Sequence, residues 1–120
     1  MENKRYYKRI NFHVEAAAKI DNKMYTGELY DIALKGALIK MNKKPGSVSG
    51  KKCNVKLKLP NSNITLEFEA KIVHQKNDFL GFSFEGADVD SITHLRRLLV
   101  LNTGDEEGID RELMSWLNET

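Results

Sequence analysis

Apolar and polar residues alternate with a period of two through most of residues 12–84, and this alternation constrains the fold more than any other feature. Successive side chains of a strand point to opposite faces, so the alternation predicts strands with one buried face. The clearest run has the apolar residues Ile64, Leu66, Phe68, Ala70 and Ile72. We expect six such strands, at residues 12–20, 24–31, 37–41, 55–59, 64–72 and 80–84, joined by turns and by a Pro/Gly loop at 43–50.

The pattern changes after Gly86 to the spacing of helices. Residues 88–91 resemble a helix cap, and the segment after them has a helical apolar stripe that ends near Gly104. A second helix is expected over residues 105–120, with Ile109, Leu113, Trp116 and Leu117 on its apolar face. The sequence therefore predicts an all-β domain with C-terminal helices, arranged as an antiparallel barrel or sandwich.

Composition narrows the class of protein. The 120 residues are 41% hydrophobic and 30% charged, as in a globular domain, and no stretch has the roughly 20 apolar residues of a membrane span. The single Cys53 and the absence of an apolar N-terminal segment predict a cytoplasmic location. The three histidines are scattered and no nucleophile or phosphate-loop pattern is present, so we expect no metal site, no cofactor and no enzyme activity.

Charge is distributed unevenly along the chain. Residues 1–58 contain fourteen Lys/Arg and five Asp/Glu, a balance of +9, whereas residues 59–120 contain five and twelve, a balance of −7. The basic first half suggests an anionic partner. The alternative is that its lysines, from Lys40 to Lys58, form only a solvated face.

Two short motifs carry the functional information. Arg5 and Arg9 are four positions apart, and a guanidinium can hydrogen-bond a phosphate or the O6 and N7 atoms of guanine. In the segment Asp31–Gly36, the carboxylate can accept hydrogen bonds from the N1–H and N2–H₂ groups of guanine. The glycine is expected to permit a bend with positive φ. Each feature alone has a simpler explanation, as a solvated arm, a turn cap or a strand bulge.

Together the motifs resemble those of the PilZ family, bacterial receptor modules for cyclic di-GMP, whose signature is Arg-x-x-x-Arg followed by Asp/Asn-x-Ser-x-x-Gly. The segments Leu80–Phe84 and His94–Leu99 are similar to the last strand and the capping helix of that family. The resemblance implies a six-stranded antiparallel β-barrel capped by one or two helices. It divides the chain into a basic arm at 1–10, the barrel and capping helix at 11–103, and a C-terminal amphipathic helix at 104–120.

The resemblance also implies roles for single residues. Arg5 and Arg9 would grip guanine edges and phosphates of cyclic di-GMP, and Lys4 would bind a phosphate as a point charge. Asp31 would hold a guanine, and Gly36 would let the backbone turn beneath the ligand. The expected function is a receptor or adaptor that changes conformation with ligand and signals through a protein partner in motility, biofilm or secretion control.

The serine of the signature is replaced by Ala33, which lacks the hydroxyl group. One hydrogen bond is worth roughly 0.5–1.5 kcal/mol, so we expect weakened rather than abolished binding. Two alternatives stay open, as does a homodimer. The first is an adaptor that binds protein without nucleotide, which Ala33 favours. The second is a barrel that binds single-stranded nucleic acid, which is opposed by the placement of Phe12, Phe68, Phe82 and Phe84 on apolar faces.

Overall fold

The structure is a computed structural model that describes the backbone of residues 14–60 and 62–118 and the side chains within those ranges up to residue 115. Within these described ranges, six strands precede two helices. The strands are β1 (Glu15–Ile20), β2 (Lys23–Ala33), β3 (Gly36–Met41), β4 (Lys52–Lys58), β5 (Thr65–Lys76) and β6 (Phe79–Ala87). The helices are α1 (Val89–Thr103) and α2 (Glu106–Asn118).

The strands form a closed antiparallel barrel in the order β1-β2-β3-β6-β5-β4. Closure comes from the pairing of β1 with β4, in which Ala16 lies opposite Leu57 and Ala18 opposite Val55. Each of the six described strands therefore has a neighbour on both sides, and none of them leaves an open edge for pairing with another chain. This architecture confirms the predicted six-stranded barrel with C-terminal helices.

Alternation along the strands fills the barrel with apolar side chains. Phe68 on β5 and Phe84 on β6 lie almost parallel, with 4.0 Å between ring centroids. Both rings are nearly fully buried. The lysines of β4 point the other way, so the period-two pattern of the sequence separates core from solvent as expected.

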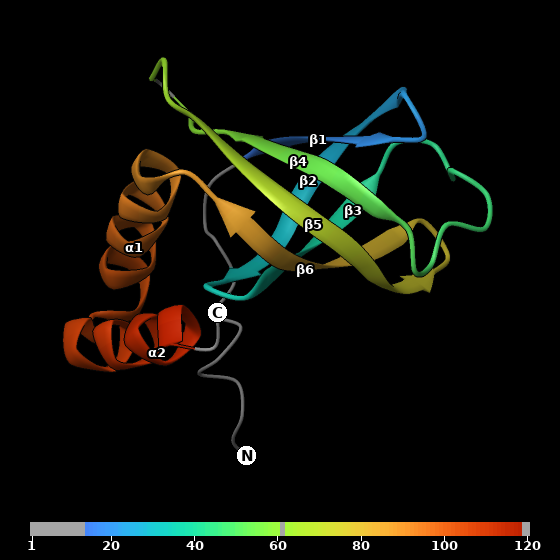
Figure 1. Ribbon diagram of the computed structural model, residues 1–120. Coiled ribbons are helices and arrows are strands. Elements are labelled where there is room, and N and C mark those ends of the chain that lie inside the picture. Colours follow the sequence, from blue (N-terminus) through green and yellow to red (C-terminus); the bar gives the residue numbers. More distant parts are fainter. Residues whose placement is uncertain (1–13, 61, 119–120) are drawn as a thin grey trace.

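The two helices lie together at one end of the barrel, and the loop between β3 and β4 lies at the other end (Figure 1). Helix α1 buries Leu95 and Leu99, and its Ser91 hydroxyl accepts a hydrogen bond from the backbone N–H of Glu67 on β5 at 2.9 Å. It ends at Gly104, whose φ of 72° is left-handed. These contacts fix α1 against β5.

Helix α2 packs on α1 through Ile109, which is buried, and Leu113, which is partly buried. An ion-pair network also joins the helices, because Arg96 lies 2.6 Å from an oxygen of Asp110 and 2.8 Å from one of Glu106. Hydrogen bonding to Asp110 and then Glu106 raises the pKa of Arg96, and the Arg96 guanidinium lowers the pKa of Asp110. The expected burial of the Trp116 and Leu117 side chains lies outside the described residues.

Candidate functional site

The turn between β2 and β3 fixes the second sequence motif in space. Asp31 and Ala33 end β2, and Gly36 begins β3. The side chain of Leu34 is fully buried in the core, which anchors the turn from below. The backbone N–H of Phe84 donates a hydrogen bond to the carbonyl of Lys35 at 2.8 Å, so the turn is also tied to β6.

A β-bulge sets the direction of Asp31. Leu29 pairs with Ile39, but the next pair is Asp31 with Leu38, so Tyr30 is the extra residue. If the register of Gly27–Leu29 continued without a bulge, Asp31 would pair with the inward-facing residue Ala37. The bulge therefore places Asp31, which is half-buried, on the outer face of the barrel beside Leu38.

Gly36 is required for a reason that the sequence did not indicate. The φ angle of Gly36 does not lie in the left-handed region, so the prediction of a bend with positive φ at this glycine is wrong. Instead, a Cβ atom at this position would lie 2.1 Å from the carbonyl oxygen of Phe82. Glycine is needed here because β3 and β6 approach each other closely, with Gly36 opposite Ser83.

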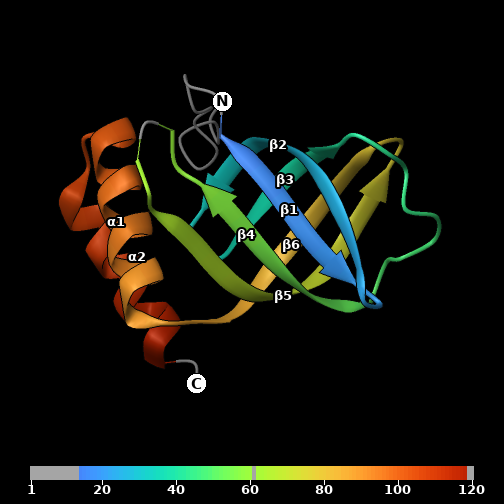
Figure 2. The same cartoon turned by 90° about the horizontal axis from the view of Figure 1, so that it is seen from above.

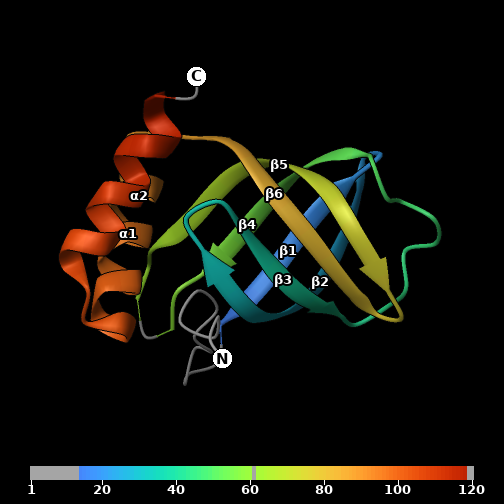
Figure 3. The ribbon, with the colours of Figure 1, turned by 90° about the horizontal axis from the view of Figure 1, so that it is seen from below.

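These motif residues line one hollow of about 460 Å³ on the outer face of β2, β3 and β6. That volume falls in the usual range of small-molecule sites. Figure 3 views the barrel from the side on which β3 and β6 are nearest, with the β2–β3 turn toward the helices. The surface of the hollow is mainly apolar, and the residues that form it include Asp31, Ala33, Lys35, Gly36, Leu38 and Val73.

The structure thus brings together three of the predicted site residues, Asp31, Ala33 and Gly36. The other three, Lys4, Arg5 and Arg9, lie outside the described residues, and their place near the hollow stays a prediction.

Sequence reasoning missed the walls of the hollow, Leu38 and Val73, although the chain holds a signal for each neighbouring bulge. Leu29 and Ile32 are three residues apart where alternation requires two, and Ile72 is followed at once by a second apolar residue, Val73. Such breaks in period two mark bulges.

A larger hollow of about 790 Å³ lies on the other side of the barrel, over β1, β4 and the first half of β5. Figure 2 shows β1 and β4 nearest the viewer. The surface of this larger hollow carries both positive and negative side chains, and the Lys56 ammonium lies 4.0 Å from a carboxylate oxygen of Glu67. Of the motif residues that the structure describes, Asp31, Ala33 and Gly36, none lines it. We therefore place the candidate site in the smaller hollow, where the motif residues meet an apolar wall.

The described residues do not indicate a metal site, a reactive cysteine or a membrane-spanning helix. Across residues 14–60 and 62–118 no group of His, Cys, Asp and Glu could hold a metal ion. Burial, followed by the charge of Glu85, raises the pKa of Cys53 to about 11, so this thiol is a poor nucleophile. No helix within those ranges is both long enough and apolar enough to cross a membrane.

Of the six aromatic residues on the described strands, three are buried inside the barrel. Phe68, Phe82 and Phe84 are buried, as expected, which removes them as stacking platforms for nucleic-acid bases. Tyr30 is 37% exposed, and its ring meets that of Phe79 edge-on, at 5.2 Å between centroids.

Comparison with known proteins agrees with this geometry. The PilZ domain family matches residues 3–101 of the chain. The fold is similar to that of the PilZ domain of CeSA from a cellulose-synthesizing bacterium, with a TM-score of 0.58 and 18% identity over 82% of this chain and 98% of that one. It is also similar to the PilZ domain of YcgR from Escherichia coli, solved with cyclic di-GMP, with a TM-score of 0.60 and 17% identity over 98% of this chain and 100% of that one.

A third similar structure is the inhibitor of motility MotI from Bacillus subtilis, with a TM-score of 0.68 and 14% identity. The alignment covers 88% of this chain but 54% of MotI, so the chain spans about half the length of that protein. At these identities the structural likeness shows the fold alone.

Proposed function

Because this chain belongs to the PilZ domain family, we propose that it is a receptor for cyclic di-GMP, and that the hollow beside the β2–β3 turn is the binding site. The observation that carries the proposal is the meeting of Asp31, Ala33 and Gly36 at one apolar hollow on the outer face of the barrel. The family consists of receptor and adaptor modules rather than enzymes, and the ligand is a second messenger rather than a cofactor.

Each residue has a physical role in this proposal. The Asp31 carboxylate accepts hydrogen bonds from the N1–H and N2–H₂ groups of one guanine, an edge that adenine lacks. Arg5 and Arg9 bind phosphates and the second edge of a guanine with two parallel hydrogen bonds each, and Lys4 adds a point charge for a phosphate. Lys35, at the rim of the hollow, adds positive charge near the same phosphates.

Ala33 lowers the affinity without removing the site. It is half-buried in the hollow and offers a methyl group in place of the hydroxyl of the family signature. The loss of one hydrogen bond of roughly 0.5–1.5 kcal/mol corresponds to about 2- to 12-fold weaker binding. The charged hydrogen bonds of two arginines are each worth more than this, roughly 1.5–3 kcal/mol.

The output of the domain is a binding event. We propose that ligand draws the basic arm of residues 1–10 over the hollow, and that the altered surface binds a protein partner in a bacterial cytoplasm. Ordering an arm costs conformational entropy, which the arginine contacts must exceed. Hydrogen exchange of the arm, measured with and without cyclic di-GMP, tests this step, and equal exchange in both states would contradict it.

Isothermal titration with cyclic di-GMP tests the proposed function directly. We expect binding by the parent chain, and a loss of about 10- to 150-fold for Arg5→Ala and for Arg9→Ala, since charged hydrogen bonds contribute roughly 1.5–3 kcal/mol. Arg97→Ala is a matched control, because Arg97 is exposed on α1, an element that does not line the hollow. Cyclic di-AMP, GTP and a short single strand serve as competing ligands.

Two results would contradict the proposal in different ways. If both arginine variants bind like the parent, the assignment of the site is wrong. If the parent does not bind cyclic di-GMP at all, the adaptor that acts without nucleotide becomes the better hypothesis.

A further inference from the structure

A second β-bulge shapes the hollow from the side opposite Asp31. On β5, Ile72 pairs with Phe82 of β6 and His74 pairs with Gly81, so Val73 is the extra residue. Ile72 is fully buried, whereas Val73 is 56% exposed. Val73 follows the inward-facing Ile72 and therefore faces outward by ordinary alternation, onto the rim of the hollow, and the bulge keeps the next residue, His74, on the outer face as well.

Leu38 stands on β3, directly across from Gly81 of β6. It is half-buried and lines the same hollow as Val73. Gly81 has no side chain, so the strand between Leu38 and Val73 forms a low floor with an apolar wall on each side. A Cβ atom at Gly81 would lie 3.0 Å from the Cβ of His74 and would raise this floor. Asp31 pairs with Leu38 from β2, so the row across the strands is Asp31, Leu38, Gly81 and Val73, and the carboxylate lies beyond Leu38 at the β2 end of this row.

We infer that Leu38 and Val73 hold the face of a purine base of the ligand while Asp31 reads its edge. This assignment rests on the proposed cyclic di-GMP site and adds the contacts that determine which ring system fits there. A purine has a flat, weakly polar face and a polar edge. A base that lies along this row covers Leu38 and Val73 with its face and turns its polar edge toward Asp31, and covering Val73 removes its apolar surface from water.

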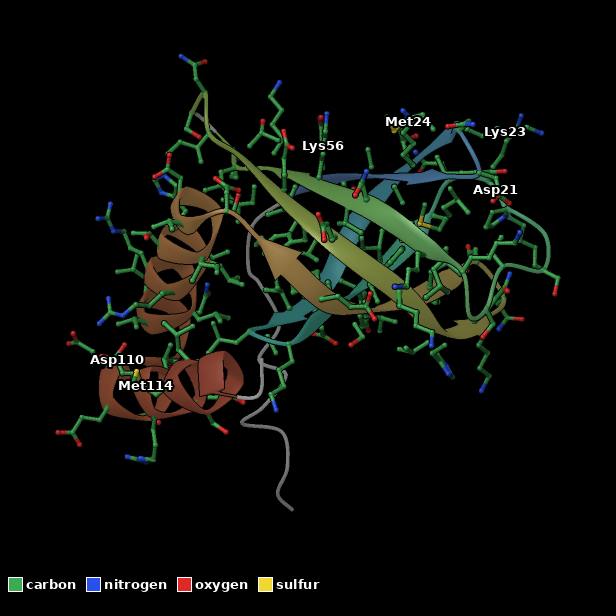
Figure 4. The ribbon with its side chains drawn as sticks, viewed as in Figure 1. Asp21, Lys23, Met24, Lys56, Asp110 and Met114 are labelled. Carbon is green, nitrogen blue, oxygen red and sulfur yellow. The ribbon has the colours of Figure 1, made fainter. Side chains whose placement is uncertain are left out.

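The alternative is that Val73 is an ordinary exposed apolar residue, since single residues of this kind are common on protein surfaces. The chain contains a matched control for this alternative. Met24 is also 56% exposed, but it lines the larger hollow on the other side of the barrel, as Lys56 does, and both residues are labelled in Figure 4. The two residues have the same exposure and differ in location.

The first experiment is titration of the full chain with cyclic di-GMP for Val73→Ala, Leu38→Ala and Met24→Ala, with thermal unfolding to check each fold. We expect roughly 5- to 15-fold weaker binding for each of the two wall variants, because each loses apolar groups that the base would cover. Met24→Ala should bind like the parent. If the parent binds and the wall variants bind equally well, the inference is wrong while the proposed function stands.

A second experiment separates contacts to the face from contacts to the edge. The inosine analogue of cyclic di-GMP lacks the N2 amino group but keeps the purine face. Val73→Ala should lose the same factor in affinity for both ligands, whereas Asp31→Asn should lose more for cyclic di-GMP. A Val73→Ala loss that depends on the amino group would overturn the assignment of Val73 to the face.

Methyl NMR of the unmodified sequence needs no variant. Ring currents of a bound purine should shift the methyl signals of Leu38 and Val73, while those of Val55, which is fully buried in β4, should stay in place. Saturating cyclic di-GMP that leaves the Leu38 and Val73 signals unmoved would refute the contact. If the parent binds no ligand, none of the three experiments shows a signal, and the failure is that of the proposed function.

Discussion

Substitution of Gly36 by alanine should disrupt the pairing of β3 with β6, and the structure allows the cost to be worked out. The added Cβ would lie 2.1 Å from the carbonyl oxygen of Phe82, whereas carbon–oxygen contacts between strands are about 3.3–3.6 Å. One strand must therefore move by roughly 1.2 Å or more. The obstacle is backbone, so it cannot yield by rotation of a side chain.

The expected loss of unfolding free energy is about 3 kcal/mol. Overpacking typically costs about 1–3 kcal/mol, and weakening two neighbouring ladder hydrogen bonds adds roughly 0.5–1.5 kcal/mol each. Alanine also restricts the unfolded chain, which offsets about 0.4–1 kcal/mol of this loss. Urea unfolding followed by tryptophan fluorescence and by circular dichroism measures the difference.

Asparagine variants distinguish close approach from left-handed backbone as the reason for Gly36. Asn22 and Asn77 already have φ values of 66° and 58° in this chain, so asparagine tolerates that conformation here. At Gly46, where φ is 82° and no atom lies within 4 Å of a built Cβ, asparagine should cost little. At Gly36 it should cost at least as much as alanine. Recovery of stability by Gly36→Asn, or a Gly36→Ala variant within about 0.5 kcal/mol of the parent, would refute the argument.

Four further outcomes follow from the structure. Ala33→Ser should bind cyclic di-GMP equally or up to about 10-fold more tightly in titration, by supplying a hydroxyl, and a clear loss would show that the local backbone differs from that of the family. Because Arg96 lowers the pKa of Asp110 below its ordinary value of 3.8, the stabilisation from this pair is present above that value and is lost as the pH falls through the lowered pKa. Acid unfolding between about pH 5 and pH 2 should therefore be less pH-dependent in Asp110→Asn, and identical profiles would contradict the pairing. The pKa of Cys53 is raised to about 11, so in the native protein this thiol should react with iodoacetamide at pH 8 roughly 100-fold or more slowly than a free thiol. Unfolding should remove the difference, and rapid labelling of the native protein would contradict the burial of Cys53. Truncation after Thr103 removes Ile109 from its packing on α1 and should lower the unfolding free energy by roughly 2 kcal/mol. Cyclic di-GMP binding should persist, and unchanged stability would argue against the α1–α2 contact.

The strands and helices were largely predictable because the signals for them are local. Each run of alternating residues gave a strand, and the stripe with Leu95 and Leu99 gave α1. The ends of the elements were less well predicted. Strand β5 continues to Lys76, past the expected end at Ile72, because its pairing with β6 holds residues whose own pattern is polar.

The candidate site was predictable in part. The spacing of Asp31, Ala33 and Gly36 identified the second motif, and the structure places all three at one hollow. The reason given for Gly36 was wrong, since it concerned the local dihedral angle. The actual constraint is the carbonyl of Phe82, which is 46 residues away in sequence, the difference between positions 82 and 36.

The sequence by itself determined which residues face the core, because burial of alternate side chains follows from the strand period alone. Tertiary structure decided the order in which the strands pair, and with it that β3 lies beside β6 rather than β4. It also decided that the bulge at Tyr30 would turn Asp31 outward, toward a hollow whose opposite rim carries Val73 of β5. A bulge leaves only a small break in the local pattern, whereas its effect depends on the register of the neighbouring strand, and that register is set by contacts between residues far apart in the chain.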